Sequence, residues 1–151
     1  MVIISHRGNL NGPLPDLENN PEQIDIAIQY HFDVEIDLWA VDGKFFLGHD
    51  YPQYSINTDW LNSRSKRIWV HCKNFQSFSY LVAKKNNLNF FFHQNDDYTL
   101  TSKNNIWVFP NKPYDENSII VSTSEEDFHH YAVKRPYGVC TNFPTKLVNF
   151  C

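Results

Sequence analysis

The sequence predicts a parallel α/β fold. Short apolar segments rich in β-branched residues recur along the 151 residues, and each has the length of a buried strand. Segments with apolar residues at helical spacing follow the first and the third of these strands. Strands that alternate with helices form parallel sheets, because a helical crossover returns the chain to the same end of the sheet. A chain of this length is expected to form one domain, residues 1–151.

Composition and charge exclude several classes of protein. The net charge of -4 leaves no broad basic surface, so we expect no binding of nucleic acid. No apolar run has membrane-spanning length, and the amino terminus lacks the layout of a signal peptide. The 3 cysteines form neither a CxxC pair nor a zinc knuckle. These features predict a cytoplasmic protein without a membrane span, and they leave its oligomeric state open.

The amino-terminal part of the chain predicts a β-α-β unit. Val2–His6 is a short apolar run with polar residues at its exit, which is typical of a buried strand. After a loop, Asn20–Pro21 has the chemistry of an N-cap and a first turn, and Gln23 is placed to complete a capping box. We therefore expect a helix to about Tyr30, followed by a second strand at residues 33–38.

The second strand has two unlike faces. Alternation places its apolar side chains on one face and the carboxylates of Asp33, Glu35 and Asp37 on the other. Carboxylates at this spacing on a buried face repel one another unless a cation lies between them. A hard divalent metal ion is the simplest such cation. Asp42–Gly43 then predicts a hairpin turn, which returns the chain and brings His49 close to the carboxylates.

The remaining elements predict a barrel with few helices. Further strands are expected at 67–72, 89–93, 106–109, 118–121 and 137–141. Helical segments are expected near Thr58–Leu61, at 75–85, after a cap at Ser124 and from Pro144. A complete eight-fold barrel takes about 250 residues. Six or seven parallel strands in this length predict a compressed TIM-like (β/α) barrel, closed or open, with several outer helices reduced or missing.

Several motifs resemble those of the glycerophosphodiester phosphodiesterase family, within the phospholipase C-like phosphodiesterases. These motifs are I-S-H-R-G at the first strand, Glu18-Asn19 in the next loop, D-V-E-I-D-L at the second strand, D-G-K-F-F-L-G-H-D after it and G-V-C-T-N-F-P near the carboxyl end. The match is strong over residues 3–50 and weaker over 68–74 and 138–144. The middle of the chain is more similar to a reduced branch of the superfamily.

The resemblance implies a TIM barrel that binds a divalent metal ion and cleaves phosphodiesters. It implies that Glu35 and Asp37 ligate the metal, that His6 and His49 form the acid/base pair, and that Arg7 holds a phosphate oxygen. Phosphodiester hydrolysis needs one group to activate the nucleophile, another to protonate the leaving alkoxide, and cations on the non-bridging oxygens.

The chain departs from the family pattern at the third metal ligand. The family has a carboxylate in an E-x-K motif, and the matching stretch here is His71-Cys72-Lys73. His71 can ligate a metal, but a neutral imidazole shifts the preference from calcium towards softer divalent ions. Asp96 or Asp97 is the alternative third carboxylate. Asn142 stands where the family often has Asp, so magnesium, calcium and softer divalent ions all stay open.

Other side chains are candidates for contact with a substrate. Lys73 matches the family pattern and is placed to neutralise phosphate. His93 follows the fourth strand at the same end of the barrel, and Glu18 is placed to orient Arg7. Trp107 and Phe109 either fill the barrel or form a platform for a sugar ring.

We therefore expect a metal-dependent phosphodiesterase acting on a small glycerol- or sugar-phosphate diester. Attack by water and attack by a substrate hydroxyl, which forms a cyclic phosphate, both stay open. The alternative is a non-hydrolytic module that binds a phosphorylated sugar in the barrel pocket. The missing glutamate favours the binding module. The two histidines, His6 and His49, favour the enzyme, because binding alone does not need a proton donor and a proton acceptor.

Overall fold

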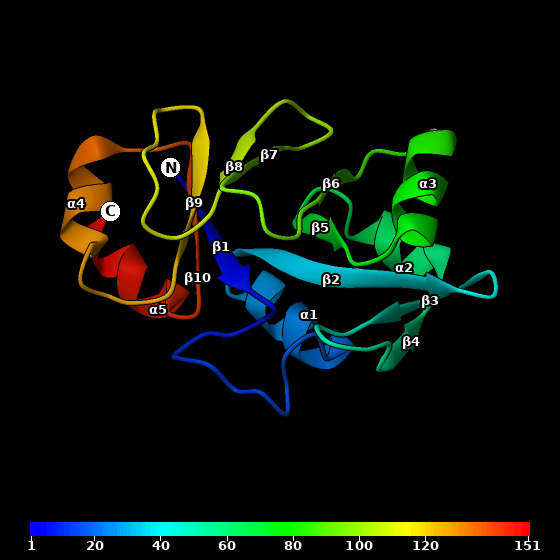
Figure 1. Ribbon diagram of the computed structural model, residues 1–151. Coiled ribbons are helices and arrows are strands. Elements are labelled where there is room, and N and C mark those ends of the chain that lie inside the picture. Colours follow the sequence, from blue (N-terminus) through cyan, green and yellow to red (C-terminus); the bar gives the residue numbers. More distant parts are fainter.

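The computed structural model describes all of residues 1–151 and shows a mixed α/β fold built on one curled sheet (Figure 1). The strands are β1 (Val2–His6), β2 (Asp33–Val41), β3 (Lys44–Leu47), β4 (Tyr54–Ile56), β5 (Ile68–Cys72), β6 (Asn89–Phe92), β7 (Tyr98–Leu100), β8 (Ile106–Val108), β9 (Ser118–Ser122) and β10 (Gly138–Thr141). The helices are α1 (Pro21–Gln29), α2 (Thr58–Ser63), α3 (Phe75–Ala83), α4 (Phe128–Lys134), α5 (Pro144–Leu147) and the short 3-10 helix η1 (Val148–Phe150). None of these helices is long and apolar enough to span a membrane.

Seven of the strands run parallel to one another, in the order β6-β5-β2-β1-β10-β9-β8. The first and last strands of the chain, β1 and β10, are neighbours in this order. The outermost two, β6 and β8, form no ladder with each other. Residues from the β7 region bridge them instead, with the Ser102 amide 2.8 Å from the Phe90 carbonyl and the Thr99 hydroxyl 3.0 Å from that of Phe92. The sheet therefore curls round without a continuous ladder.

The seven parallel strands agree with the six or seven that the sequence predicts. Three antiparallel pairings extend this parallel core, so the sheet as a whole is mixed rather than a regular parallel barrel. β3 pairs with β2, β4 with β3, and β7 with β8. The expected hairpin turn is present, with positive φ at Asp42 (50°) and Gly43 (74°), as a type I′ turn requires. β4 and β7 were not predicted, because each has three half-buried or exposed residues and no apolar run.

Two predicted helix starts were wrong in detail. Asn20 caps α1 by accepting a hydrogen bond from the Glu22 amide, but Gln23 does not complete a capping box. Its side-chain amide donates to the Gly8 carbonyl at 3.1 Å, which ties α1 to the end of β1. α4 begins at Phe128 rather than directly after Ser124, and no side chain caps it.

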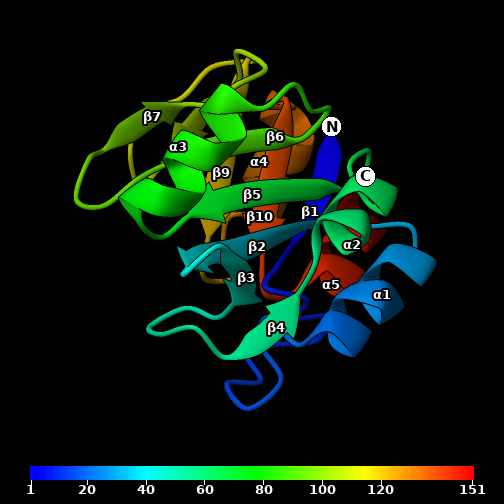
Figure 2. The ribbon, with the colours of Figure 1, turned by 90° about the vertical axis from the view of Figure 1, so that its right-hand side faces the viewer.

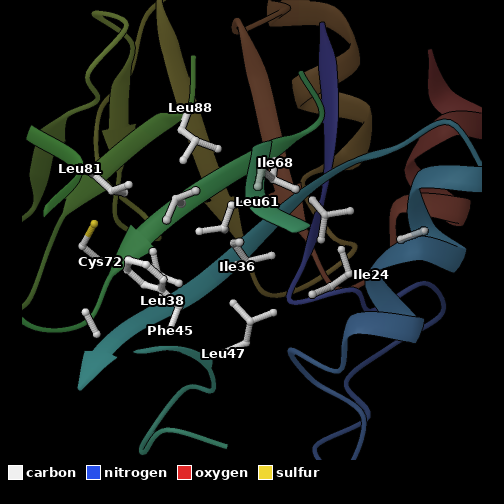
Figure 3. Close-up of a cluster of buried hydrophobic side chains, with 14 residues drawn as sticks. Ile24, Ile36, Leu38, Phe45, Leu47, Leu61, Ile68, Cys72, Leu81 and Leu88 are labelled. Carbon is white, nitrogen blue, oxygen red and sulfur yellow. The ribbon is translucent and has the colours of Figure 1, made fainter. Parts of the chain in front are cut away.

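The helices lie outside the curled sheet, as Figures 1 and 2 show. α1, α2 and α3 cover β2 and β5 and bury the largest apolar cluster (Figure 3). This cluster includes Ile24, Ile36, Leu61 and Leu81. Cys72 is buried in the same cluster, as its place in the alternation of β5 predicts. The connections from β6 to β8 and from β8 to β9 carry no helix, in agreement with the expected loss of outer helices.

A second apolar cluster fills the inside of the curve. It consists of Ile4, Trp69, Phe91, Trp107, Ile119 and Cys140, one from each of six parallel strands. The Phe91 and Trp107 rings stack with their centroids 4.4 Å apart. These side chains fill the interior below the carboxyl ends of the parallel strands. The interior is therefore open to polar groups and ligands only at those carboxyl ends.

We expect Ile36→Ala to destabilise the fold by about 2–5 kcal/mol, because it leaves a cavity in the largest buried cluster. Urea unfolding followed by circular dichroism measures this loss. Val82→Ala, at a position on α3 that is 62% exposed, is the matched control and should change the free energy of unfolding by less than about 0.5 kcal/mol. Equal effects of the two substitutions would contradict the assignment of the core.

Candidate active site

The carboxyl ends of the parallel strands open into a pocket of about 420 Å³. The strand register brings its first components together, because His6 is the partner of Glu35 and Asp37 is the partner of His71. The residues that line the pocket come from all around the sheet: His6, Arg7, Glu35, His49, His71, Lys73, His93, Gln94, Trp107, Phe109, Pro110, Val121 and Thr123. Nine of the candidate side chains from the sequence therefore share one pocket, and Asp37 and Glu18 contact that group from beside it.

Asp37 is fully buried (0% exposed) and has several polar partners. Its Oδ2 accepts a hydrogen bond from Asn19 Nδ2 at 2.9 Å and lies 3.1 Å from Arg7 Nε. Its Oδ1 lies 3.1 Å from His71 Nδ1 and 3.4 Å from Lys73 Nζ. Burial raises the pKa of the Asp37 carboxyl, but His71, Arg7 and Lys73 outweigh burial and hold that pKa well below its usual value. Asp37 is therefore a permanent anion at the base of the pocket.

Glu35 is almost as deeply buried (2% exposed) but has far fewer partners. Its Oε2 lies 3.9 Å from His6 Nε2 and accepts no hydrogen bond, and its Oε1 lies 3.7 Å from His71 Nδ1. Burial and the neighbouring charge of Asp37 raise the pKa of the Glu35 carboxyl well above its usual value. Arg7 and Lys73 act against this rise without offsetting it, so the charged form of Glu35 is incompletely compensated within the protein.

Glu35, Asp37 and His71 form a possible metal cluster, since each offers one ligand atom and these atoms lie within 4.8 Å of one another. His71 Nε2 lies 2.9 Å from the His93 carbonyl, which only accepts hydrogen bonds, so Nε2 must carry the hydrogen. In a neutral imidazole, Nδ1 then directs a lone pair at two carboxylates. This arrangement needs either a second proton or a cation between the atoms, and the two oxygens and one nitrogen fit a divalent ion.

The alternative third carboxylates lie elsewhere. Asp96 and Asp97 are exposed in the loop before β7, and Asp97 forms an ion pair with Lys112 at 2.9 Å. Neither belongs to the cluster of Glu35, Asp37 and His71. Strand pairing explains the difference, because His71 is directly opposite Asp37 whereas the loop after β6 has no ladder to hold it there.

A chain of hydrogen bonds determines which nitrogen of His6 is free. The Leu14 amide can only donate, and it donates to Asn9 Oδ1 at 2.9 Å. Asn9 Nδ2 must therefore be the donor to Asn142 Oδ1 at 2.9 Å, and it also donates to Glu18 Oε1 at 2.8 Å. Asn142 Oδ1 is then an acceptor for His6 Nδ1, 2.9 Å away. His6 consequently carries its hydrogen on Nδ1 and directs the lone pair of Nε2 into the pocket.

Burial also keeps His6 neutral. Desolvation, followed by the nearby charge of Arg7, lowers the pKa of His6 from 6.5 to about 4. The side chain is therefore an uncharged base near neutral pH.

Arg7 connects Asp37 to Glu18. Its Nη1 donates to Glu18 Oε2 at 2.9 Å, and its backbone adopts a left-handed conformation (φ 56°) that turns the chain out of β1. Burial lowers the pKa of the guanidinium, but the carboxylates of Asp37, Glu35 and Glu18 outweigh it and raise that pKa. Burial raises the pKa of the Glu18 carboxyl, but hydrogen bonds from Asn9 and Arg7 outweigh burial and lower it. Glu18 thus holds Arg7 in place from outside the pocket.

His49 stands at the mouth of the pocket, with its side chain 40% exposed. Its Nδ1 donates to Asp50 Oδ1 at 2.7 Å, which leaves Nε2 for contact with a ligand. The turn before it requires Gly48, which has a φ of 152° and where a Cβ atom would overlap the Tyr51 carbonyl oxygen. The Gly48 carbonyl is held by Trp39 Nε1 at 2.7 Å, so the position of His49 is set by the β2–β3 hairpin.

Asn9 and Asn19 had no predicted role, although both are buried and hold groups of the site. Asn19 has positive φ (62°), and its side chain makes two hydrogen bonds with Asp37, one to the backbone amide and one to Oδ2, each 2.9 Å long. The loop that contains them has several asparagines, and no local pattern distinguishes the buried ones from those that only form turns.

Comparison with known proteins shows a similarity of fold to a solved structure. No family model matches the chain, and no curated protein matches it. Among solved structures, the crystal structure of a putative glycerophosphodiester phosphodiesterase from Galdieria sulphuraria is similar, with a TM-score of 0.61 and 14% sequence identity. The alignment covers 99% of this chain and 96% of that one. The chain therefore shares the fold of this protein over nearly its whole length, in agreement with the family that its motifs resemble.

Proposed function

We propose that the chain is a divalent-metal-dependent phosphodiesterase that uses two histidines as base and acid. One observation carries the proposal: the free Nε2 of His6, the cationic groups of Arg7 and Lys73 and the carboxylate-imidazole cluster meet in one pocket. The name of the structural neighbour from Galdieria sulphuraria supports the same class of substrate. A small glycerol- or sugar-phosphate diester fits these groups.

The charges of the site favour a phosphodiester together with a divalent cation. Arg7 and Lys73 pair with Asp37, Arg7 also pairs with Glu18, and the charges of both cations act on the Glu35 carboxyl. With all of these groups ionised, the set has an excess of one negative charge. A phosphodiester anion raises the excess to two, and one divalent cation balances it. Glu35, Asp37 and His71 would hold this ion, which would supply positive charge to the non-bridging oxygens of the substrate.

The protein residues then have separate tasks. Arg7 and Lys73 bind the non-bridging oxygens and fix the phosphorus atom in the pocket. His6 Nε2 takes the proton from the attacking hydroxyl, of water or of the substrate itself, as the new P–O bond forms. His49 donates a proton from Nε2 to the leaving alkoxide as the old P–O bond breaks. Asp50 accepts the Nδ1 hydrogen of His49 and keeps the ring oriented during this transfer.

A non-hydrolytic module for a phosphorylated sugar is the second candidate. The observation that favours it is the exposure of His49, which stands at the mouth of the pocket rather than among the buried groups. Arg7 and Lys73 are sufficient to bind a phosphate group. The two candidates differ in whether His49 is needed for turnover.

We expect Glu35→Gln to lower the affinity for a divalent ion by about tenfold or more, because a neutral amide replaces a carboxylate ligand. Calorimetric titration with Mn²⁺ and Mg²⁺ measures the change. Asp33→Asn is the matched control, since Asp33 faces the same side of β2 but binds Trp69 and Arg67 instead. A variant that binds the metal ions as tightly as the wild type would remove Glu35 from the metal site.

His49→Ala is expected to lower kcat by on the order of 10² to 10⁴ while leaving the affinity for a phosphodiester nearly unchanged, because its proton is needed only in the transition state. His49→Asn should be almost as inactive, since an amide cannot exchange a proton near neutral pH. His129→Ala, on the exposed side of α4, is the control. Binding without turnover in the wild type would favour the binding module, and turnover that survives both substitutions would exclude His49 as the acid.

Asn142→Leu removes the acceptor that holds the hydrogen of His6 on Nδ1. We therefore expect this hydrogen to exchange between Nδ1 and Nε2 in the variant. Two-dimensional ¹H–¹⁵N NMR of the histidine rings should show hydrogen on Nδ1 alone in the wild type and on both nitrogens in exchange in the variant. A positioned base contributes a factor of roughly 10² to 10⁴ to kcat. The variant keeps the base but loses its orientation, so its kcat should fall by less than this factor. Asn142→Asp retains an acceptor and should retain the tautomer. A wild type with hydrogen on Nε2 would contradict the assignment.

A further inference from the structure

The pocket has a second half that the proposed chemistry does not use. Its charged half comes from β1, β2 and β5, whereas the opposite wall, contributed by β6 and β8, carries His93, Trp107, Phe109 and Pro110. No carboxylate and no lysine or arginine lies on this wall. A phosphate group does not need such a surface, so the wall is available to another part of the substrate.

A row of three rings leads from the charged half of the pocket, along the opposite wall, to the solvent. His71 contacts Asp37 through Nδ1, the His93 ring lies 6.1 Å from that of His71, and the Phe109 ring lies 6.1 Å from that of His93. Phe109 is 47% exposed although it lines the pocket. A substrate whose phosphate lies between Arg7 and Lys73 can therefore extend along this row of rings towards the mouth.

The wall is held in place by contacts within the protein. The Phe109 amide donates to the Asp97 carbonyl at 2.9 Å, and Asp97 binds Lys112 at the same distance. The backbone of His93 is held because its carbonyl accepts the hydrogen bond from His71. A surface that is ordered before binding loses little conformational entropy when a ligand arrives.

Polar groups also line the pocket beside these rings. Gln94 and Thr123 belong to the lining and can meet polar atoms of a bound group. Nδ1 of His93 is inaccessible to solvent, so the His93 ring offers its face rather than this atom.

We propose that this wall is a subsite for an alcohol part of the diester that carries a planar aromatic ring with a polar edge. The ring would stack along His93 and Phe109, as aromatic groups do in offset or tilted arrangements, and polar atoms on its edge would meet Gln94 or Thr123. This inference rests on the proposed phosphodiesterase function and names the class of substrate for it.

The experiment compares two synthetic diesters, 2-hydroxyethyl 2-phenylethyl phosphate and 2-hydroxyethyl 2-cyclohexylethyl phosphate, with the metal-loaded full chain. The free hydroxyl of each compound allows attack by the substrate itself as well as by water. The two have alcohols of similar acidity and size, so their chemical reactivity is similar and only the planarity of the ring differs. Disappearance of the diester, followed by ³¹P NMR, measures kcat/KM whichever bond breaks. We expect the phenyl compound to be preferred by about three- to tenfold in the wild type.

Substitutions at Phe109 test whether this side chain causes the preference for the phenyl compound. Phe109→Leu should remove it, whereas Phe109→Tyr, which keeps the ring face, should retain it. Equal kcat/KM values for the two diesters, or a preference for the cyclohexyl compound, would overturn the subsite and leave the phosphodiesterase proposal standing. If neither diester is cleaved, the phosphodiesterase proposal fails, and calorimetric binding of the same two compounds decides the subsite: tighter binding of the phenyl compound supports it, and equal binding overturns it.

Discussion

The burial of two carboxylates on the inner face of β2 is the constraint on which the rest of the site depends. A buried carboxylate is unfavourable unless charges and hydrogen bonds compensate it. Asp37 receives this compensation from Asn19, Arg7 and Lys73, which come from the loop after β1 and from the end of β5. These segments must therefore come together around β2. Glu35 forms no ion pair with Arg7 or Lys73, and burial together with the charge of Asp37 raises its pKa, so the two neighbouring carboxylates differ in how well they are compensated.

β2 links the stability of the fold to the chemistry of the pocket, because its two faces serve different purposes. The outer face carries Ile36 and its apolar neighbours into the largest core cluster, while the inner face carries the carboxylates. A slip of one residue would exchange the two faces, so the apolar core holds the register of the acidic groups. The same register sets Glu35 beside His6 and Asp37 beside His71.

Hydrogen-bond partners determine which ring nitrogen of each histidine in the pocket carries hydrogen. A neutral imidazole has one N–H group and one lone pair, and the partner of the first decides where the second points. Asn142 occupies Nδ1 of His6, and the His93 carbonyl occupies Nε2 of His71. Nε2 of His6 and Nδ1 of His71 therefore face Glu35, at 3.9 and 3.7 Å, and Nδ1 of His71 also lies 3.1 Å from Asp37 Oδ1. These neutral partners fix the orientation of the two rings.

The sequence by itself determined the α/β class, the Asp42–Gly43 hairpin and the candidate residues on β1 and β2, because strand alternation and turn chemistry act between near neighbours in the chain. Only the tertiary structure decided that His71, and not a carboxylate of the loop after β6, completes the cluster, since this depends on pairing between β2 and β5. It also decided that Asn9 and Asn19 are buried supports and that β4 and β7 add antiparallel edges. These features arise from contacts between segments far apart in the chain, and local pattern carries no signal for such contacts.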